Sequence, residues 1–258
     1  TLVMKITLIT ACYNSAATIR TALESVLRQT WPELEYWVID GGSADGTVEI
    51  LREVESEFGG RMRWLSEPDG GFYDALNKGI RLATGEVIGI LNADDFFAAD
   101  EVLAEVARTF ADPAVDCVFG DVRFVNASDL TTTVRYYSSK YFRPWMARFG
   151  YMPAHPTFYC RRTCFEAFGT YRTDYRIAAD HELLVRFLIK EKIRYRYIPK
   201  VFTVMRMGGM STRSVESTLI LNRENIRACR ANGLYSNGIM QLGKYLFKIP
   251  GLLFKGGY

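Results

Sequence analysis

The sequence predicts an α/β fold, with a mostly parallel central sheet flanked by helices. Two observations lead to this prediction. Short apolar runs of strand length alternate with segments of helical periodicity in the first half of the chain, and such alternation places parallel strands between two layers of helices. Polar residues directly follow several of these runs, and ligands of parallel sheets bind beyond the carboxyl ends of the strands.

The first half predicts four strands, at residues 5–10, 36–40, 62–65 and 86–91. Each interval between them has the periodicity of an amphipathic helix. The apolar residues that mark these helices are Ile19, Ala22, Leu23, Val26 and Leu27, then Val48, Leu51, Val54 and Phe58, then Tyr73, Leu76, Ile80 and Ala83.

The second half has a less regular pattern. Short strands are expected within residues 115–137, an irregular aromatic and basic segment over 138–156, a helix over 177–190, two strands within 194–206 and a helix over 212–231. Because no linker composition separates the two halves, we expect one domain over residues 1–258. It would comprise a first half (4–112), a smaller second half (113–211) and a helical tail (212–258).

The composition is that of an ordinary globular protein. Of 258 residues, 48% are hydrophobic and 24% are charged, which allows a sizeable core. A net charge of +3 is too mild to indicate a nucleic-acid partner. The five cysteines form no C-x-x-C pair and predict reduced thiols. Because no run of about 18 apolar residues is present, we expect a cytoplasmic protein.

The stretch Asn92-Ala93-Asp94-Asp95 places two adjacent carboxylates directly after an apolar strand. Neighbouring acids repel each other and lose hydration when they are partly buried. One interpretation is a helix cap, although Asp100 is better placed to cap the next helix. The other is a hard cation, Mg²⁺ or Mn²⁺, which takes one or two carboxylates together with phosphate oxygens. The residues alone leave both interpretations open.

Four further residues also have two interpretations. Asp40 ends an apolar strand and begins a glycine-rich turn, so it is either a turn residue or a carboxylate that needs a donor from a ligand. Asp180, at the start of a predicted helix, is either a cap or a general base. His155 and His181 are the only histidines and are either substrate contacts or, more commonly, structural residues.

Taken in order, three segments resemble the family 2 glycosyltransferases, which are inverting enzymes of the GT-A fold. They are TACYNSAATIRTALESVLRQTWPELEYWVIDGGSADGT, SEPDGGFYDALNKGIRLATGEVIGILNADD and HPTFYCRRTCFEAFGTYRTDYRIAADHELLVR. The resemblance extends over residues 4–210. It implies a Rossmann-like GT-A sheet, with residues 4–112 binding the nucleotide-sugar and residues 113–211 binding the acceptor.

The resemblance also implies a role for each matching residue. Asp180 corresponds to the catalytic base, and Asp94 and Asp95 to the acids that hold a divalent metal, Mn²⁺ or Mg²⁺, against the donor diphosphate. The implied nucleotide-sugar contacts are Ala11, Tyr13, Asp40, Asp69, Asn77, Asn92 and Asp94. Further candidates for the acceptor side or the donor loop are His155, His181, Gly209 and Ser211.

The implied activity is inverting, metal-dependent transfer of a sugar from a UDP-sugar to a hydroxyl of a glycan or lipid-linked saccharide, in bacterial polysaccharide biosynthesis. The chain departs from the family pattern at Asn92, which replaces the first acid of the usual DxD, and at Gly41, which replaces a second acid. These departures motivate the alternative of a catalytically silent nucleotide-sugar-binding or scaffold relative. A nucleotidyltransferase is disfavoured because a basic glycine-rich phosphate loop is missing. The sugar, the linkage and the oligomeric state stay open.

The last stretch, residues 242–258, interleaves apolar residues with lysines. It is too short to span a bilayer, but it suits a membrane interface with its lysines toward anionic head groups. The alternatives are a terminal helix packed on the domain and a dimer contact. We expect a peripheral contact with the inner face of the plasma membrane, with residues 138–152 as a second face for a lipid-linked acceptor.

Overall fold

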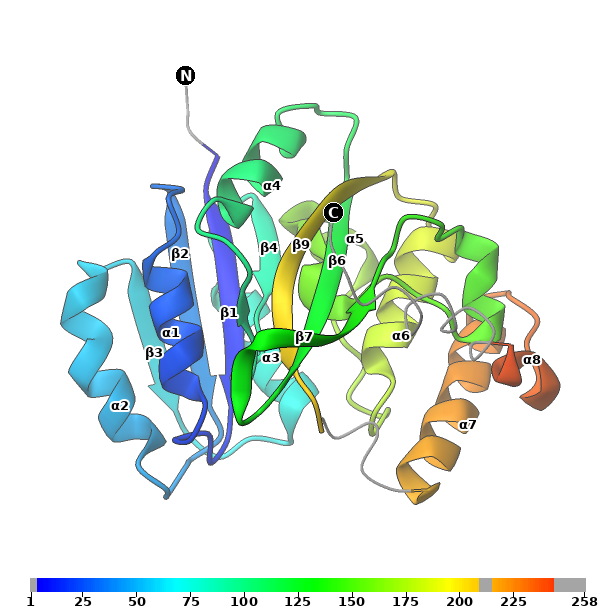
Figure 1. Ribbon diagram of the computed structural model, residues 1–258. Helices are drawn as coiled ribbons and strands as arrows, with labels where there is room; N and C mark the ends of the chain where they lie inside the picture. The colour runs from blue at the N-terminus through cyan, green and yellow to red at the C-terminus, as the bar shows by residue number, and fades with distance from the viewer. Residues whose placement is uncertain (1–3, 209–214, 244–258) are drawn as a thin grey trace.

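The computed structural model describes residues 4–208 and 215–243. The predicted site residues Gly209 and Ser211 and the tail from residue 244 onward lie outside the described residues. At the centre is a nine-stranded sheet with the order β3-β2-β1-β4-β8-β6-β9-β5, and β7 pairs with β6 off this path (Figure 1). The predicted α/β class, with a mostly parallel sheet flanked by helices, is confirmed.

The first four strands form the parallel part of the sheet. They are β1 (Ile6–Cys12), β2 (Leu34–Asp40), β3 (Met62–Ser66) and β4 (Val87–Ile90), paired in parallel. Side chains of a strand alternate between the two faces of a sheet. Leu8 and Ile9 of β1 are both fully buried, and they belong to two separate cores. The sheet is therefore covered on both faces, as the apolar strands predict.

Helices complete each core. One face is covered by α1 (Ile19–Leu27), α2 (Thr47–Val54) and α4 (Val102–Phe110). The other is covered by α3 (Phe72–Leu82), α5 (Arg162–Phe168), α6 (Ala179–Val185) and its π-helical continuation η4 (Arg186–Lys190), together with α7 (Val215–Ala231). Short helical segments are η1 (Glu55–Phe58), η2 (Pro144–Phe149), η3 (His155–Thr157) and α8 (Gly238–Leu242).

The second half of the sheet corrects two predictions. Instead of several short strands, β6 (Cys117–Asn126) and β7 (Asp129–Tyr137) form one long antiparallel hairpin. β9 (Tyr195–Arg206) is a single strand where two were predicted. Its register against β6 shifts around Pro199. Proline has no N–H to donate to the ladder, so a bulge accommodates it without ending the strand.

Two short strands were not predicted. β8 (Tyr159–Arg161) lies antiparallel between β4 and β6, and β5 (Phe96–Phe97) pairs with β9. Strands of two or three residues are too short to have a period of their own.

The predicted helix cap at Asp100 is wrong. The N-cap of α4 is Glu101, without a side-chain cap bond, and the Asp100 carboxylate instead lies 3.4 Å from the Arg28 guanidinium. All five cysteines are free and buried, as predicted. Within residues 4–208 and 215–243, no helix has the length and apolar character needed to cross a membrane.

Candidate active site

Segments distant in sequence meet beyond the carboxyl ends of the parallel strands. β1 and β2 run in register to their last residues, so that Cys12 lies opposite Asp40, and β3 places Ser66 on the other side of Asp40. On the far side of β1, β4 ends at Ile90, immediately before the residues that we call the acid turn, Asn92–Asp95. The strand ends that were predicted to share one edge of the sheet do so.

Asp40 is buried, and its carboxylate accepts five hydrogen bonds from other groups of the protein. Its carboxylate accepts hydrogen bonds from the N–H groups of Gly42 (3.1 Å) and Ser43 (2.9 Å). It also accepts from the hydroxyls of Ser43 (2.5 Å) and Ser66 (2.6 Å) and from the Cys12 thiol (3.5 Å). Burial opposes ionisation of Asp40, but these hydrogen bonds outweigh it and hold its pKa below the usual value.

Beside Asp40, the first loop and the loop before α3 come together at Gly41. A Cβ atom at Gly41 would lie 2.9 Å from Asp69 Oδ2 and 3.4 Å from Cδ2 of Tyr13. Tyr13 itself is 64% exposed, whereas Ala11 is buried at the end of β1. Asp69 also accepts a hydrogen bond of 2.8 Å from the N–H of Gly71. The Asp69 carboxylate thus lies where a side chain at position 41 would begin.

The acid turn is built differently. Asp95 is 1% exposed, and its Oδ2 accepts a hydrogen bond of 2.8 Å from the Asn92 amide. Burial, and then the neighbouring Asp94, raise the pKa of Asp95 well above its usual value. Asp94 is exposed, and no donor to its carboxylate occurs among the described residues. Asn92 Oδ1 is buried and likewise has no hydrogen-bond partner in the described part of the chain.

These features fit a divalent cation. A buried acceptor without a partner rarely stays unsatisfied in a native protein, and Mg²⁺ or Mn²⁺ prefers carboxylate, carbonyl and phosphate oxygens. Across residues 4–208 and 215–243, no group of three or more His, Cys, Asp or Glu side chains could hold an ion. The acid turn alone would therefore bind a cation incompletely, and ligand oxygens and water would complete its shell.

Arg206, at the end of β9, holds the acid turn from the other side. Its guanidinium donates to the carbonyl of Asp94 and lies over the ring of Phe96, 5.6 Å from the centroid. A fixed positive charge therefore lies beside the two acids. It also opposes the rise in the pKa of Asp95 that burial causes.

Asp180 lies in the first turn of α6. It is half-buried; its Oδ1 accepts a hydrogen bond of 2.8 Å from the His181 N–H and lies 3.4 Å from the Tyr73 hydroxyl. The Tyr73 ring stacks on Tyr171, with 5.8 Å between centroids. Burial, and then Asp180, raise the pKa of Tyr73 well above its usual value, so Tyr73 stays a neutral donor.

His155 and Asn77 both contact Tyr171. His155 Nε2 lies 2.6 Å from the Tyr171 hydroxyl, and burial lowers the pKa of His155 against the opposing effect of Asp180. The Asn77 amide donates to the carbonyl of Tyr171 (2.8 Å) and accepts its N–H (2.9 Å). Both ends of the Asn77 amide therefore hold Tyr171, and the nucleotide-sugar contact at Asn77 stays a prediction.

His181, the other candidate histidine, points elsewhere. Its ring is buried, and Nε2 lies 3.7 Å from the Cys229 Sγ of α7. The structure therefore places the His181 ring between α6 and α7, although its backbone N–H contacts Asp180.

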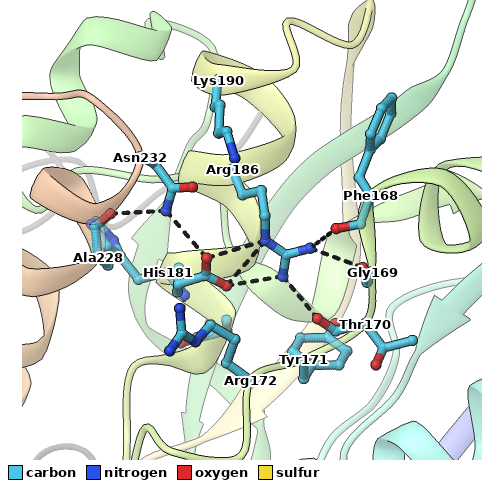
Figure 2. A network of polar contacts seen from close by, with 12 residues as sticks. Phe168, Gly169, Thr170, Tyr171, Arg172, His181, Arg186, Lys190, Ala228 and Asn232 are labelled. Carbon is cyan, nitrogen blue, oxygen red and sulfur yellow. Dashed lines mark hydrogen bonds and ion pairs between the residues drawn. The ribbon is translucent and has the colours of Figure 1, made fainter.

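Figure 2 shows how the loop before Tyr171 is held. The Arg186 guanidinium donates to the carbonyls of Phe168, Gly169 (2.9 Å) and Thr170 (2.8 Å). It also pairs at 2.9 Å with the buried Glu182 carboxylate, which accepts a further hydrogen bond of 3.1 Å from Asn232, the residue after α7. A buried ion pair of this kind is tolerated because its remaining hydrogen-bonding groups find partners.

Tyr171, Arg206 and Glu224, which accepts hydrogen bonds from the N–H groups of residues 176–178, were not predicted as site residues from the sequence. Tyr73 was predicted only as a core position of a helix. Their partners lie far away along the chain: Tyr73 and Ile177 are 104 residues apart, and Asn77 and Tyr171 are 94 apart. No local pattern indicates contacts over such separations.

The fold is that of the GT-A glycosyltransferases. TarS 1–349 from S. aureus, solved with UDP-GlcNAc, superposes with a TM-score of 0.66 at 19% identity, covering 90% of this chain and 68% of that chain. In a longer TarS structure the match covers 40% of that chain. The mannosyltransferase PcManGT from Pyrobaculum calidifontis, solved with GDP-Man and Mn²⁺, has a TM-score of 0.65 at 22% identity and covers 98% of this chain and 69% of that chain.

Residues 7–175 match the family model of glycosyl transferase family 2, and the chain belongs to this family. It is 30% identical over 216 residues to the PGL/p-HBAD biosynthesis glycosyltransferase of Mycobacterium bovis (strain BCG / Pasteur 1173P2), covering 80% of this chain and 79% of the relative. A stretch of 114 residues, 44% of this chain, is 33% identical to 12% of the chondroitin synthase of Pasteurella multocida (strain Pm70). The predicted family is confirmed, and the nucleotidyltransferase alternative is set aside.

Proposed function

We propose that this glycosyltransferase moves a sugar from a UDP-sugar to a hydroxyl of a glycan or lipid-linked saccharide, with inversion at the anomeric carbon. The observation that carries the proposal is the acid turn, where an exposed carboxylate, a buried carboxylate and an acceptor without a partner adjoin one another. The UDP-GlcNAc bound by TarS and the Mn²⁺ bound by PcManGT support the donor and the metal. Relatives named for PGL/p-HBAD biosynthesis and chondroitin synthesis support a glycan or glycolipid acceptor.

In this proposal the two sides of the site have separate tasks. Asp94 and Asp95 would hold Mn²⁺ or Mg²⁺, which when bound would stabilise the negative charge of the leaving diphosphate. Asn92 Oδ1 accepts a hydrogen bond from a hydroxyl of the UDP-sugar. The His181 N–H donates to Asp180 Oδ1, and the Tyr73 hydroxyl lies 3.4 Å from the same oxygen, which leaves Oδ2 to take the proton of the acceptor hydroxyl. The hydroxyl attacks opposite the leaving diphosphate, so the configuration inverts without a covalent intermediate.

The test is a calorimetric titration of UDP into the wild type and into the Asp94→Ala/Asp95→Ala variant, with Mn²⁺ and then with EDTA. We expect binding that requires both the metal and the two acids. Asp180→Asn is the matched control: it should bind UDP as the wild type does but lose turnover with a panel of UDP-sugars and acceptors. Wild-type binding of UDP without transfer to any acceptor would favour the silent relative, and full turnover by Asp180→Asn would exclude Asp180 as the base.

A peripheral membrane contact is part of the proposal. Near η2, Tyr141 and Trp145 are exposed, and Lys140 lies 5.5 Å from the Tyr141 ring centroid. α8 packs against η2, and its Ile239 and Leu242 are exposed as well. Aromatic and aliphatic side chains beside lysine suit the interface of an anionic bilayer. Sedimentation with anionic vesicles, but not with neutral ones, would support this contact, and absence from both pellets would exclude it.

A further inference from the structure

The helix α7 lies beyond the family match, which ends at residue 175, yet one of its side chains reaches the segment before Asp180. Glu224 Oε1 accepts a hydrogen bond of 2.7 Å from the N–H of Arg176. Its Oε2 accepts two of 2.9 Å from the N–H groups of Ile177 and Ala178. A single carboxylate thus holds three consecutive peptide N–H groups, and such charge-assisted hydrogen bonds are about twice as strong as neutral ones.

The same peptide is held from the opposite side by α3. The Tyr73 hydroxyl donates at 2.5 Å to the carbonyl of Ile177, and it also lies 3.4 Å from Asp180 Oδ1. Ile177 is therefore fixed at its N–H by α7 and at its carbonyl by α3. We call Glu224, Ile177 and Tyr73 together the Ile177 clamp.

A second contact of α7 holds the chain just before the clamp. Arg227 forms an ion pair with Asp174, and its guanidinium lies over the Tyr175 ring, 4.2 Å from the centroid. Glu224 and Arg227 are three residues apart and so lie on the same face of α7. This face follows residues 174–178, which lead directly into the turn that carries Asp180.

We propose that Glu224 is a positioning residue for Asp180, so that α7 forms part of the active site although it touches no reacting atom. The inference rests on the proposed role of Asp180 as general base. Only Ala179 separates Ala178 from Asp180, so a shift of the clamped peptide moves the carboxylate directly. A displacement of about 1 Å at a reacting group can lower the rate on the order of 100-fold.

The experiment compares three variants of α7. Glu224→Ala removes all three acceptor contacts, and Glu224→Gln keeps one carbonyl oxygen but loses the charge. Glu216→Gln is the matched control, because Glu216 lies on the same helix, is 79% exposed, faces the Arg176 guanidinium at 3.9 Å and accepts from no backbone N–H of residues 4–208 and 215–243. Hydrogen exchange of the peptide containing residues 176–178 should accelerate roughly tenfold or more in Glu224→Ala, less in Glu224→Gln and not at all in Glu216→Gln.

Kinetics provide the second measurement. With the UDP-sugar that the wild type turns over fastest, we expect kcat of Glu224→Ala to fall roughly 10- to 100-fold. Its affinity for UDP with Mn²⁺ should stay within about twofold, because the acid turn is untouched, and Glu224→Gln should recover part of kcat. Tyr73→Phe combined with Glu224→Ala should lose less than the sum of the single effects, since both residues hold one peptide.

Three results would overturn the inference: unchanged exchange at residues 176–178 in Glu224→Ala, equal losses of kcat and UDP affinity, or the same loss in Glu216→Gln. If Glu224→Ala does not fold, as thermal unfolding would reveal, Glu224→Gln provides the same comparison. Failure of the proposed function is distinguishable, because it would appear as full turnover by Asp180→Asn. If the wild type releases UDP from none of the UDP-sugars tested, the proposed function fails. Hydrogen exchange at residues 176–178 then still tests whether Glu224 holds this peptide.

Discussion

The ends of β2 and β4 both carry acids, but the protein treats them in opposite ways. Asp40 at the end of β2 accepts hydrogen bonds from five donors of its own chain. In the acid turn after β4, the Asn92 amide is the side-chain donor that the described residues supply to Asp95, and Asn92 Oδ1 has no partner there. A carboxylate at a strand end therefore does not by itself indicate a ligand; the number of donors that the chain provides to it is more informative.

The difference has an energetic meaning. A buried carboxylate with several donors stabilises the folded chain, whereas a buried carboxylate with few donors, such as Asp95, costs free energy until a cation reaches it. Asp40 should therefore affect mainly folding, and the acid turn mainly binding. The following substitutions test this contrast, from the largest expected effect to the smallest.

Asp94→Ala should separate binding from stability most clearly. Because the exposed Asp94 carboxylate has no partner in the described part of the chain, its loss should change the free energy of unfolding by less than about 0.5 kcal/mol. Affinity for UDP in the presence of Mn²⁺ should fall on the order of 100-fold, a binding loss of about 2.7 kcal/mol. Calorimetry and urea denaturation measure the two quantities, and a destabilised variant with unchanged affinity would contradict the contrast.

Asp40→Ala should show the reverse balance. Its removal leaves the hydroxyls of Ser43 and Ser66 and two backbone N–H groups without their acceptor. We expect the free energy of unfolding to fall by about 2–3 kcal/mol, measured by urea denaturation at neutral pH. A fall as small as that expected for Asp94→Ala would mean that solvent replaces these hydrogen bonds.

The pH dependence of stability tests the contribution of the Asp40 carboxylate in a second way. Its pKa in the folded protein is lower than the usual value of 3.8, so ionised Asp40 stabilises the fold above the unfolded pKa, and this contribution is lost as the pH falls through the folded pKa. Between about pH 5 and pH 3 the wild type should therefore lose more stability than Asp40→Asn. If the carboxylate were not the stabilising form, urea denaturation would show the same loss of stability between the two pH values in the wild type and in Asp40→Asn.

Gly41→Asp tests whether Asp69 has taken over the space of a second acid. The new Cβ would lie 2.9 Å from Asp69 Oδ2, so Asp69 must move, and like charges would adjoin Asp40. We expect UDP affinity to fall about tenfold or less, corresponding to about 1.4 kcal/mol. In the Gly41→Asp/Asp69→Ala double variant part of this affinity should return, whereas Gly41→Ala alone should show a smaller loss because it adds no charge.

Cys12→Ser should have the smallest effect. The Cys12 thiol donates weakly to Asp40 at 3.5 Å, and a hydroxyl would make a stronger but slightly misplaced donor, so stability should change by less than about 1 kcal/mol. Burial, and then Asp40, raise the pKa of the Cys12 thiol far above its usual value. Native protein should therefore resist alkylation at Cys12, which mass spectrometry after iodoacetamide treatment can measure.

The sequence predicted the regular part of the molecule well because its forces are local. The helices that carry Leu23, Leu51 and Leu76 and the strands that they cover follow from periodicity alone, and all three leucines are buried. The acids at strand ends were found because parallel sheets bring those ends to one edge. The position of Asp40 at the end of a strand was predicted correctly. The hydrogen bonds that it accepts from Ser66 and Cys12 depend on strand register, which a single sequence does not reveal.

The second half was predicted less completely for physical reasons. Pro199 in a bulge interrupts the pattern of β9 without ending the strand, and β8 is three residues long. The Ile177 clamp joins residues from α3, the approach to α6, and α7; in the sequence Glu224 resembles an ordinary surface position of a helix, and Tyr73 a core position. Side chains that act through the backbone of a distant segment leave no periodic trace in the sequence.

The position of β8 also sets an order of assembly during synthesis. β4 and β6 each pair with β8 and not with one another, so the sheet exists as two separate pieces until residues 159–161 have left the ribosome. The strands that lead to Asp40 and to the acid turn are complete in sequence by residue 95, whereas Arg206, which holds the acid turn, arrives with β9, and Glu224 arrives later still. Non-local pairing of this kind is slow, so we expect the surroundings of Asp40 to form first and the contacts of Glu224 last.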